Sequence, residues 1–134
     1  MTRVMVNGTF DILHRGHIEM LNFAKSKGDA VLVVIDTDRR VQELKGDDRP
    51  INNQEDRKFH LENLKAVDSV LFFDSKEQLI EIMKSWKPDV YVKGSDWKKD
   101  RPSTAEEYCK EVIYYDRVGE YSTTNTIQNI INRG

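Results

Sequence analysis

The fold of this chain is decided by the stretch Gly8-Thr9-Phe10-Asp11-Ile12-Leu13-His14-Arg15-Gly16-His17. It follows a short apolar run, Val4-Met5-Val6, and precedes an amphipathic segment from Ile18 to Lys27. This order is typical of a strand, a glycine-containing loop and the start of a helix. Backbone N–H groups and the positive end of the helix dipole meet at such a corner, so the stretch predicts a binding site for an anion such as phosphate.

The composition predicts one folded domain, residues 1–134, rather than a disordered chain. Charged residues make up 33% of the chain and hydrophobic residues 38%, and the formal net charge is -2. A general nucleic-acid binder would show a basic excess, so we expect no nucleic-acid partner. An anionic small molecule needs only a local cationic cluster. Because Cys109 is the single cysteine, an internal disulfide is excluded.

The sequence contains no segment that is typical of membrane insertion or secretion. The apolar patch near the N-terminus is too short for a signal-peptide core, and no apolar run reaches the length of a membrane span. We therefore expect a cytoplasmic enzyme or binding protein.

Short apolar runs alternate with amphipathic segments along the chain. The runs predict buried strands at Val4–Asn7, Ala30–Ile35, Ser69–Phe73, Val90–Val92 and Val112–Tyr115. Helices are predicted at Ile18–Lys27, at Gln54–Val67 after the N-cap Asn53, from Ser75 to just before Pro88, and at about Thr124–Asn132. In the second helix, the broad apolar face is made of Phe59, Leu61, Leu64 and Val67. Alternating strands and helices predict an α/β fold, a doubly wound parallel five-stranded sheet.

Ligands of such sheets bind beyond the carboxyl ends of the strands, where the strand order reverses. The glycine-histidine stretch follows the first predicted strand, and Lys93-Gly94-Ser95-Asp96-Trp97 follows the fourth. If these two strands flank the switch point, both segments face one pocket.

The histidine stretch carries the strongest motif. It contains neither Gly-x-Gly-x-x-Gly nor a P-loop, but it resembles the His-x-Gly-His signature of the nucleotidyltransferase superfamily. The longer pattern Gly-Thr-Phe-Asp-x-x-His-x-Gly-His, which marks cytidylyltransferase-like enzymes, is matched at every defined position. The alternative is that the two histidines simply lie on a surface turn.

The resemblance implies a Rossmann-like nucleotidyltransferase fold and transfer of a nucleoside monophosphate from a nucleoside triphosphate to a phosphate, with release of pyrophosphate. The attacking phosphate is already nucleophilic, so catalysis needs positioning and charge neutralisation. The catalytic residues would include His14 and His17, and Asp11 would orient the acceptor or the nucleotide. The nucleotide would contact Gly8, Thr9, Phe10 and Gly16, where Gly16 allows a close approach to the backbone.

The segment from Leu44 to Asn52, followed by Arg57, resembles the adenylyltransferase that activates heptose 1-phosphate. In that family the positions of Lys45 and Arg57 contact phosphate, so Lys45 would be catalytic and Arg57 would bind substrate. In isolation both would be read as solvated charges. The match at Asn52 is equally well explained as part of the entry into the following helix.

The third segment combines features of two enzyme classes. Val92-Lys93-Gly94 resembles the heptose enzymes, whereas Asp96-Trp97 resembles glycerol-3-phosphate cytidylyltransferases. The nucleotide would contact Lys93, Gly94 and Asp96. Trp97 fits core packing equally well.

The fourth segment, Arg117 to Thr124, resembles the Arg-x-x-Gly-x-Ser-Thr-Thr ending of the cytidylyltransferases. Arg117 would be catalytic, and the nucleotide would contact Ser122, Thr123 and Thr124. Gly119 and Glu120 depart from the family pattern, which keeps a non-catalytic nucleotide-binding module open as an alternative.

The favoured hypothesis is transfer of AMP from ATP to D-glycero-heptose 1-phosphate, giving ADP-heptose. The alternative is transfer from CTP to glycerol 3-phosphate, giving CDP-glycerol. Mg²⁺ would arrive with the triphosphate, and no metal site of the protein is expected. The aspartates that lie near the predicted mouth are read as solvated loop charges rather than a metal cage: Asp36, Asp38, Asp47 and Asp48. A homodimer is expected from the resemblance.

Overall fold

The structure, a computed structural model, describes residues 1–94 and 107–115. Its elements along the chain are β1 (Arg3–Gly8), α1 (Arg15–Ser26), β2 (Ala30–Asp36), α2 (Asp38–Lys45), α3 (Gln54–Glu62), β3 (Ser69–Phe73), α4 (Lys76–Trp86), β4 (Val90–Gly94) and β5 (Glu111–Tyr115).

The strands form one parallel sheet in the order β3-β2-β1-β4-β5. The chain moves from β1 outward to β2 and β3, and later returns to the other side of β1 with β4 and β5. The strand order therefore reverses between β1 and β4, where Val6 pairs with Val92. The predicted α/β fold and the predicted switch point are confirmed.

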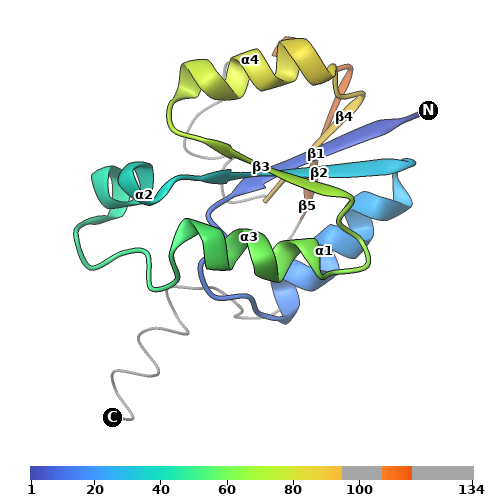
Figure 1. The fold of residues 1–134 in the computed structure, drawn as a ribbon. Coiled ribbons are helices and arrows are strands. Elements are labelled where there is room, and N and C mark those ends of the chain that lie inside the picture. The colour runs from blue at the N-terminus through green and yellow to red at the C-terminus, as the bar shows by residue number, and fades with distance from the viewer. Residues whose placement is uncertain (95–106, 116–134) are drawn as a thin grey trace.

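Helices cover both faces of the sheet (Figure 1). Val4 and Val6 of β1 point into a core cluster that includes Leu21 of α1 and Leu61 of α3. Met5, between them, points to the opposite face and packs with residues of α4. This alternation is the two-residue period of a strand that is buried on both faces. The sheet is doubly wound, as predicted.

Helix α2 was not predicted, and it lies beyond the carboxyl end of the sheet (Figure 1). Only Val41 of this helix is buried, so the segment lacks the apolar stripe that identifies a surface helix. Its N-cap is Thr37, whose side chain accepts a hydrogen bond from the Arg40 backbone N–H at 3.3 Å. The Thr37 hydroxyl also donates to Asp74 after β3, which fixes α2 to the sheet.

Helix α3 ends at Glu62, five residues before the predicted end at Val67. The apolar residues that extend the pattern pack against the core outside regular helix. Phe59 is exposed, so this residue of the predicted apolar face does not join the core. The N-cap at Asn53 and the start of α4 after Ser75 are as predicted.

Two remaining expectations concern the last predicted helix and membrane-spanning segments. The predicted helix at Thr124–Asn132 lies outside the described residues. Among the helices that the structure describes, none is both long enough and apolar enough to cross a membrane.

Candidate active site

Two histidines hold the first turn of α1. His14 is the N-cap, and its Nδ1 accepts the Gly16 backbone N–H at 3.1 Å. The Nδ1 of His17 accepts the His14 backbone N–H at 3.3 Å. The two rings stack with their centroids 3.8 Å apart. This is a capping box made of imidazoles in place of the usual hydroxyl and carboxylate.

The capping arrangement fixes the tautomer of both rings. A ring nitrogen that accepts an N–H bond cannot carry a proton, so each neutral imidazole carries its proton on Nε2. Each ring therefore offers an Nε2–H donor at the amino end of a helix. His14 Nε2 is buried. Donors in this position are suited to the oxygens of a phosphate.

Phe10 supports the second histidine from below. Its ring centroid lies 5.1 Å from that of His17, and the residue is buried in the core. Its φ of 51° lies in the left-handed region, which is unusual for a bulky residue and typical of constrained functional turns. A Cβ on Gly8 would lie 3.0 Å from the Phe10 ring, so a side chain at position 8 would require the Phe10 ring to shift by a few tenths of an ångström.

Asp11 is 1% exposed and fastens the segment after α2 to the histidine loop, which is the stretch from Gly8 to His17. Its carboxylate accepts the backbone N–H groups of Ile51 at 2.8 Å and Asn52 at 2.7 Å. The Asn52 side chain donates in turn to the Asp11 backbone carbonyl at 2.6 Å. The Asn52 match is thus explained by loop architecture, and Asp11 holds the segment after α2 against the turn after β1.

Arg57 is completely buried within this assembly. Its guanidinium donates to the backbone carbonyls of Asn52, Thr9 and Asp36, and to the Asp38 carboxylate at 2.8 Å. The sequence placed Arg57 at a substrate phosphate, whereas the structure shows four donations to protein oxygens. The side chain therefore braces the loops after β1, β2 and α2.

Lys45 ends α2 on the same side of the sheet. Although much of the residue is exposed, partial burial lowers the pKa of its ammonium group, and the positive charge of Arg49 lowers it further. The carboxylates of Asp36 and Asp11 act in the opposite direction. These interactions place Lys45 close to the loops that Asp11 and Arg57 hold.

The sequence suggested that Asp36 is a solvated loop charge. The structure places it at the end of β2, where it is buried. It is 7% exposed and accepts a hydrogen bond from Arg40 at 3.1 Å. Burial raises its pKa, and this effect outweighs the opposing charges of Arg40 and Lys45. Asp38 is not free in solution either, because it accepts from Arg57.

The remaining predicted residues are placed only in part. Lys93 and Gly94 end β4, beside β1, and Lys93 is buried with its Nζ 5.6 Å from the Tyr91 ring centroid. Thr9 and Gly16 lie in the histidine loop and are half-buried. The other predicted residues lie outside the described residues: Asp96, Arg117, Ser122, Thr123 and Thr124.

The sequence interpretation gave no role to Arg49, which lies between Lys45 and Asn52. Its Nε is 3.7 Å from the Asp11 carboxylate. Arg49 could have been found from the sequence, because it lies in the segment from Leu44 to Asn52 that the resemblance selected together with Lys45.

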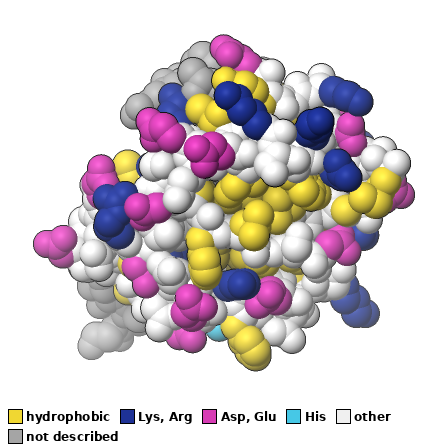
Figure 2. Space-filling model, turned by 45° about the horizontal axis from the view of Figure 1, so that its top comes forward, with side chains coloured by type: hydrophobic (Ala, Val, Ile, Leu, Met, Phe, Trp, Pro, Cys, Tyr) yellow, Lys and Arg dark blue, Asp and Glu magenta, His cyan; other side chains and the backbone are white. Residues whose placement is uncertain are grey.

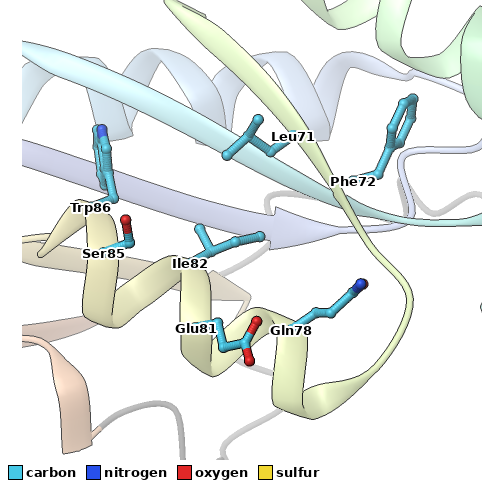
Figure 3. Close-up of a pocket in the computed structure, with 7 residues that line it drawn as sticks. All are labelled: Leu71, Phe72, Gln78, Glu81, Ile82, Ser85 and Trp86. Atoms are coloured by element: carbon cyan, nitrogen blue, oxygen red, sulfur yellow. The ribbon is translucent and has the colours of Figure 1, made fainter.

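A separate hollow of about 510 Å³ lies between β3 and α4 (Figures 2 and 3). Leu71 and Ile82 form its apolar centre, and among the described residues that line it Glu81 carries the only charge. None of its described lining residues is a lysine or an arginine that would pair with a polyphosphate. The hollow flanks the edge strand, whereas the histidine loop follows β1 in the middle of the sheet.

The fold is a parallel α/β sheet, and two histidine donors lie at the helix start that follows β1, beside the switch point. This combination is typical of the class of nucleotidyltransferases. The chain belongs to the cytidylyltransferase-like family, whose profile matches residues 5–129.

Similar proteins agree with this membership. The chain is 46% identical over 129 residues to the bifunctional protein HldE of Campylobacter fetus subsp. fetus, covering 96% of this chain and 28% of that protein. HldE of Nitratiruptor sp. is 43% identical over 95% of this chain and 27% of its own length. The chain therefore spans little more than a quarter of these relatives.

A solved structure extends the comparison. The crystal structure of the lipopolysaccharide core biosynthesis protein from Thermoplasma volcanium matches with a TM-score of 0.67 and 30% identity, covering 91% of this chain and 99% of that one.

Proposed function

We propose that this chain transfers AMP from ATP to D-glycero-heptose 1-phosphate, giving ADP-heptose and pyrophosphate. The observation that carries the reaction type is the pair of imidazoles at the start of α1, each with its Nδ1 engaged in the helix cap, so that the neutral ring carries its donor on Nε2. The acceptor is supported by the identity to HldE over nearly the whole chain.

The chemistry is a single in-line displacement. A phosphate oxygen of the sugar phosphate forms a bond to the α-phosphorus of ATP, while the bond from that phosphorus to the bridging oxygen breaks. The electron pair leaves with pyrophosphate. Since the attacking oxygen is already anionic, the protein has to align the two phosphates and offset their charge.

The side chains divide into two groups by this proposal. His14, His17 and Lys45 donate to phosphate oxygens, with Arg117 as a fourth catalytic residue. Asp11 and Arg57 position the loops rather than touching the reacting atoms, because their polar atoms are engaged with the protein.

The nucleotide contacts of this proposal come from three segments. The histidine loop contributes Gly8, Thr9, Phe10 and Gly16, and the end of β4 contributes Lys93 and Gly94. The remaining contacts are Asp96, Ser122, Thr123 and Thr124. Phe10 also packs against the ring of His17.

Mg²⁺ would enter with ATP and would supply further charge neutralisation on the triphosphate when bound. Phosphate and water oxygens are its preferred ligands in such sites. The described residues contain no group of three or more His, Cys, Asp or Glu side chains arranged to hold a metal ion. We further propose that the protein works in the cytoplasm, as a homodimer.

The direct test is a grid of pyrophosphate-release assays, with ATP or CTP against heptose 1-phosphate or glycerol 3-phosphate. Release with ATP and heptose 1-phosphate alone is the expected result. Release with CTP and glycerol 3-phosphate alone would replace the substrates and keep the reaction type. Nucleotide binding by calorimetry with no release in any pair would identify a non-catalytic module.

A further inference from the structure

Arg49 lies on a loop whose backbone is fixed on both sides. Before it, Gly46 caps α2 and its carbonyl accepts the Arg49 backbone N–H at 3.2 Å. After it, the N–H groups of Ile51 and Asn52 are held by the Asp11 carboxylate. The direction in which the Arg49 side chain leaves the backbone is therefore set by the fold.

The guanidinium of Arg49 is largely buried, and two of its three nitrogens have no acceptor among the residues that the structure describes. The side chain is 13% exposed. Its Nε and Nη2 atoms are buried and have no hydrogen-bond partner among residues 1–94 and 107–115. Buried N–H groups of a cation are costly when they remain unsatisfied, and such groups in folded proteins call for an explanation.

The nearest carboxylate does not satisfy this side chain. Asp11 lies 3.7 Å from Arg49 Nε, which is beyond hydrogen-bond distance, and both of its oxygens already accept backbone N–H groups. Asp36 is paired with Arg40, and Asp38 with Arg57. These three carboxylates are thus engaged with other donors.

Positive charge accumulates around Arg49. Its charge contributes, after partial burial, to lowering the pKa of Lys45, and the Arg57 charge acts in the same direction. Arg49 and Arg57 therefore lie close enough to Lys45 to disfavour its charged form, while Asp36 and Asp11 act in the opposite direction. An anion placed among the three cations would remove this repulsion and supply the missing acceptors.

We propose that Arg49 binds a substrate phosphate through Nε and Nη2, in addition to the phosphate-binding residues assigned above. The inference rests on the proposed function for the identity of the ligand, because that reaction brings two phosphate-bearing substrates to this edge of the sheet. The planar fork of arginine suits two oxygens of one phosphate, which a lysine in its place would contact as a point charge.

The test compares Arg49→Gln and Arg49→Lys with the native chain. Calorimetry measures the binding of ATP, of heptose 1-phosphate and of inorganic tripolyphosphate, each separately. Steady-state pyrophosphate release gives kcat and the KM of each substrate. Arg39→Gln is the matched control, since Arg39 lies on α2 but pairs with Asp74 and Glu43 at the surface. Urea unfolding verifies that each variant is folded.

We expect Arg49→Gln to weaken binding of one phosphate ligand about 10- to 100-fold, the range for hydrogen bonds to charged groups. Arg49→Lys should recover part of this loss, and Arg39→Gln should bind as the native chain does. A loss confined to ATP and tripolyphosphate assigns Arg49 to the nucleotide. A loss confined to heptose 1-phosphate assigns it to the acceptor.

Binding of all three ligands within twofold of native by a folded Arg49→Gln variant would overturn the proposal. If Arg49→Gln fails to fold, Arg49→Lys decides by the same criterion. Failure of the proposed function is distinguishable: a native chain that binds tripolyphosphate through Arg49 but releases no pyrophosphate retains this site and loses the reaction.

Discussion

The two ring nitrogens of His14 do different work, and substitutions can separate them. Nδ1 caps α1, and Nε2 is the donor assigned to phosphate. The amide of asparagine reaches the Nδ1 position, and that of glutamine the Nε2 position. His14→Asn should therefore keep the cap and the stability of the fold, since asparagine is a favoured N-cap. It should lower kcat by about 10²–10³, the usual cost of removing one such donor.

The paired variant His14→Gln should show the reverse balance. It loses the cap, so urea unfolding should report a loss of about 1 kcal/mol. It should retain more turnover than His14→Asn because its amide N–H lies near the position of Nε2. Equal turnover in the two variants would contradict the assignment of Nε2 as the working atom.

Arg57 should behave as a structural residue in spite of its place in a functional motif. Arg57→Met leaves three backbone carbonyls and Asp38 without their buried donor, so we expect a loss of about 3–5 kcal/mol in unfolding free energy. Arg39→Met, on the surface of α2, is the control and should change stability little. A fully stable Arg57→Met variant with a raised KM for ATP would instead support direct contact with substrate.

The contacts of Asp11 and Arg57 differ from the substrate contacts that the resemblance implies. The histidine motif selected His14, His17 and Asp11, and the resemblance of the following segment selected Arg57. Neither could show that Asp11 and Arg57 are buried, because aspartate and arginine are mostly exposed and their burial depends on partners far away in sequence. The Arg57 partner Thr9 is 48 residues away. Local patterns carry no information about such pairs.

The connection between α2 and α3 depends on one backbone conformation. Gly46 has φ 104° and ψ 168°, a region that residues with a side chain rarely adopt. Gly46→Ala should cost about 1–3 kcal/mol in unfolding free energy. It should also raise the KM of the phosphate substrates several-fold, because Lys45 and Arg49 stand on either side of the glycine.

The control for this turn is Asp47→Ala, which changes an exposed neighbour without demanding an unusual φ. Unfolding in urea and steady-state kinetics on both variants provide the comparison. An unchanged KM in Gly46→Ala, together with lower stability, would show that the turn serves the fold alone.

At the level of elements, the strands were predictable and α2 was not. All five predicted strands lie where their β-branched and aromatic runs indicated, with bounds that differ by at most two residues. Those runs are buried on both faces, so composition alone identifies them. Helix α2 buries only Val41, and its stability depends on the Thr37 cap and contacts to Asp74. Thr37 followed by Asp38 was the available signal for its start.

At the scale of the whole molecule, Asp89 links three neighbouring strands at the amino end of the sheet. Its carboxylate accepts the Arg3 backbone N–H at 2.9 Å and lies 3.2 Å from Lys110 Nζ. Its backbone bonds to Arg3 and Glu111 complete the connection of β1, β4 and β5. The hydrogen bond from Arg3 and the Lys110 charge hold the pKa of Asp89 below its ordinary value of 3.8.

A carboxylate whose pKa is lowered by folding stabilises the folded state at pH values above its ordinary pKa, here 3.8. This contribution is lost as the pH falls through the lowered pKa of the folded state. Asp89→Asn should therefore be less stable than the native chain at pH 7, and the difference should shrink toward pH 3. Urea midpoints at pH 7, 5 and 3 measure it, with Glu62→Gln at the exposed end of α3 as the control. A difference that stays constant with pH would show that charge is not the cause.

We propose that the turn between β1 and α1 holds the triphosphate while the α-phosphorus forms a bond to the acceptor oxygen and releases pyrophosphate. A crystal structure of the chain with a non-hydrolysable ATP analogue tests it most directly. We predict phosphate oxygens within hydrogen-bond distance of Nε2 of both His14 and His17. A triphosphate bound elsewhere, with both imidazoles making no contact to it, would contradict the account.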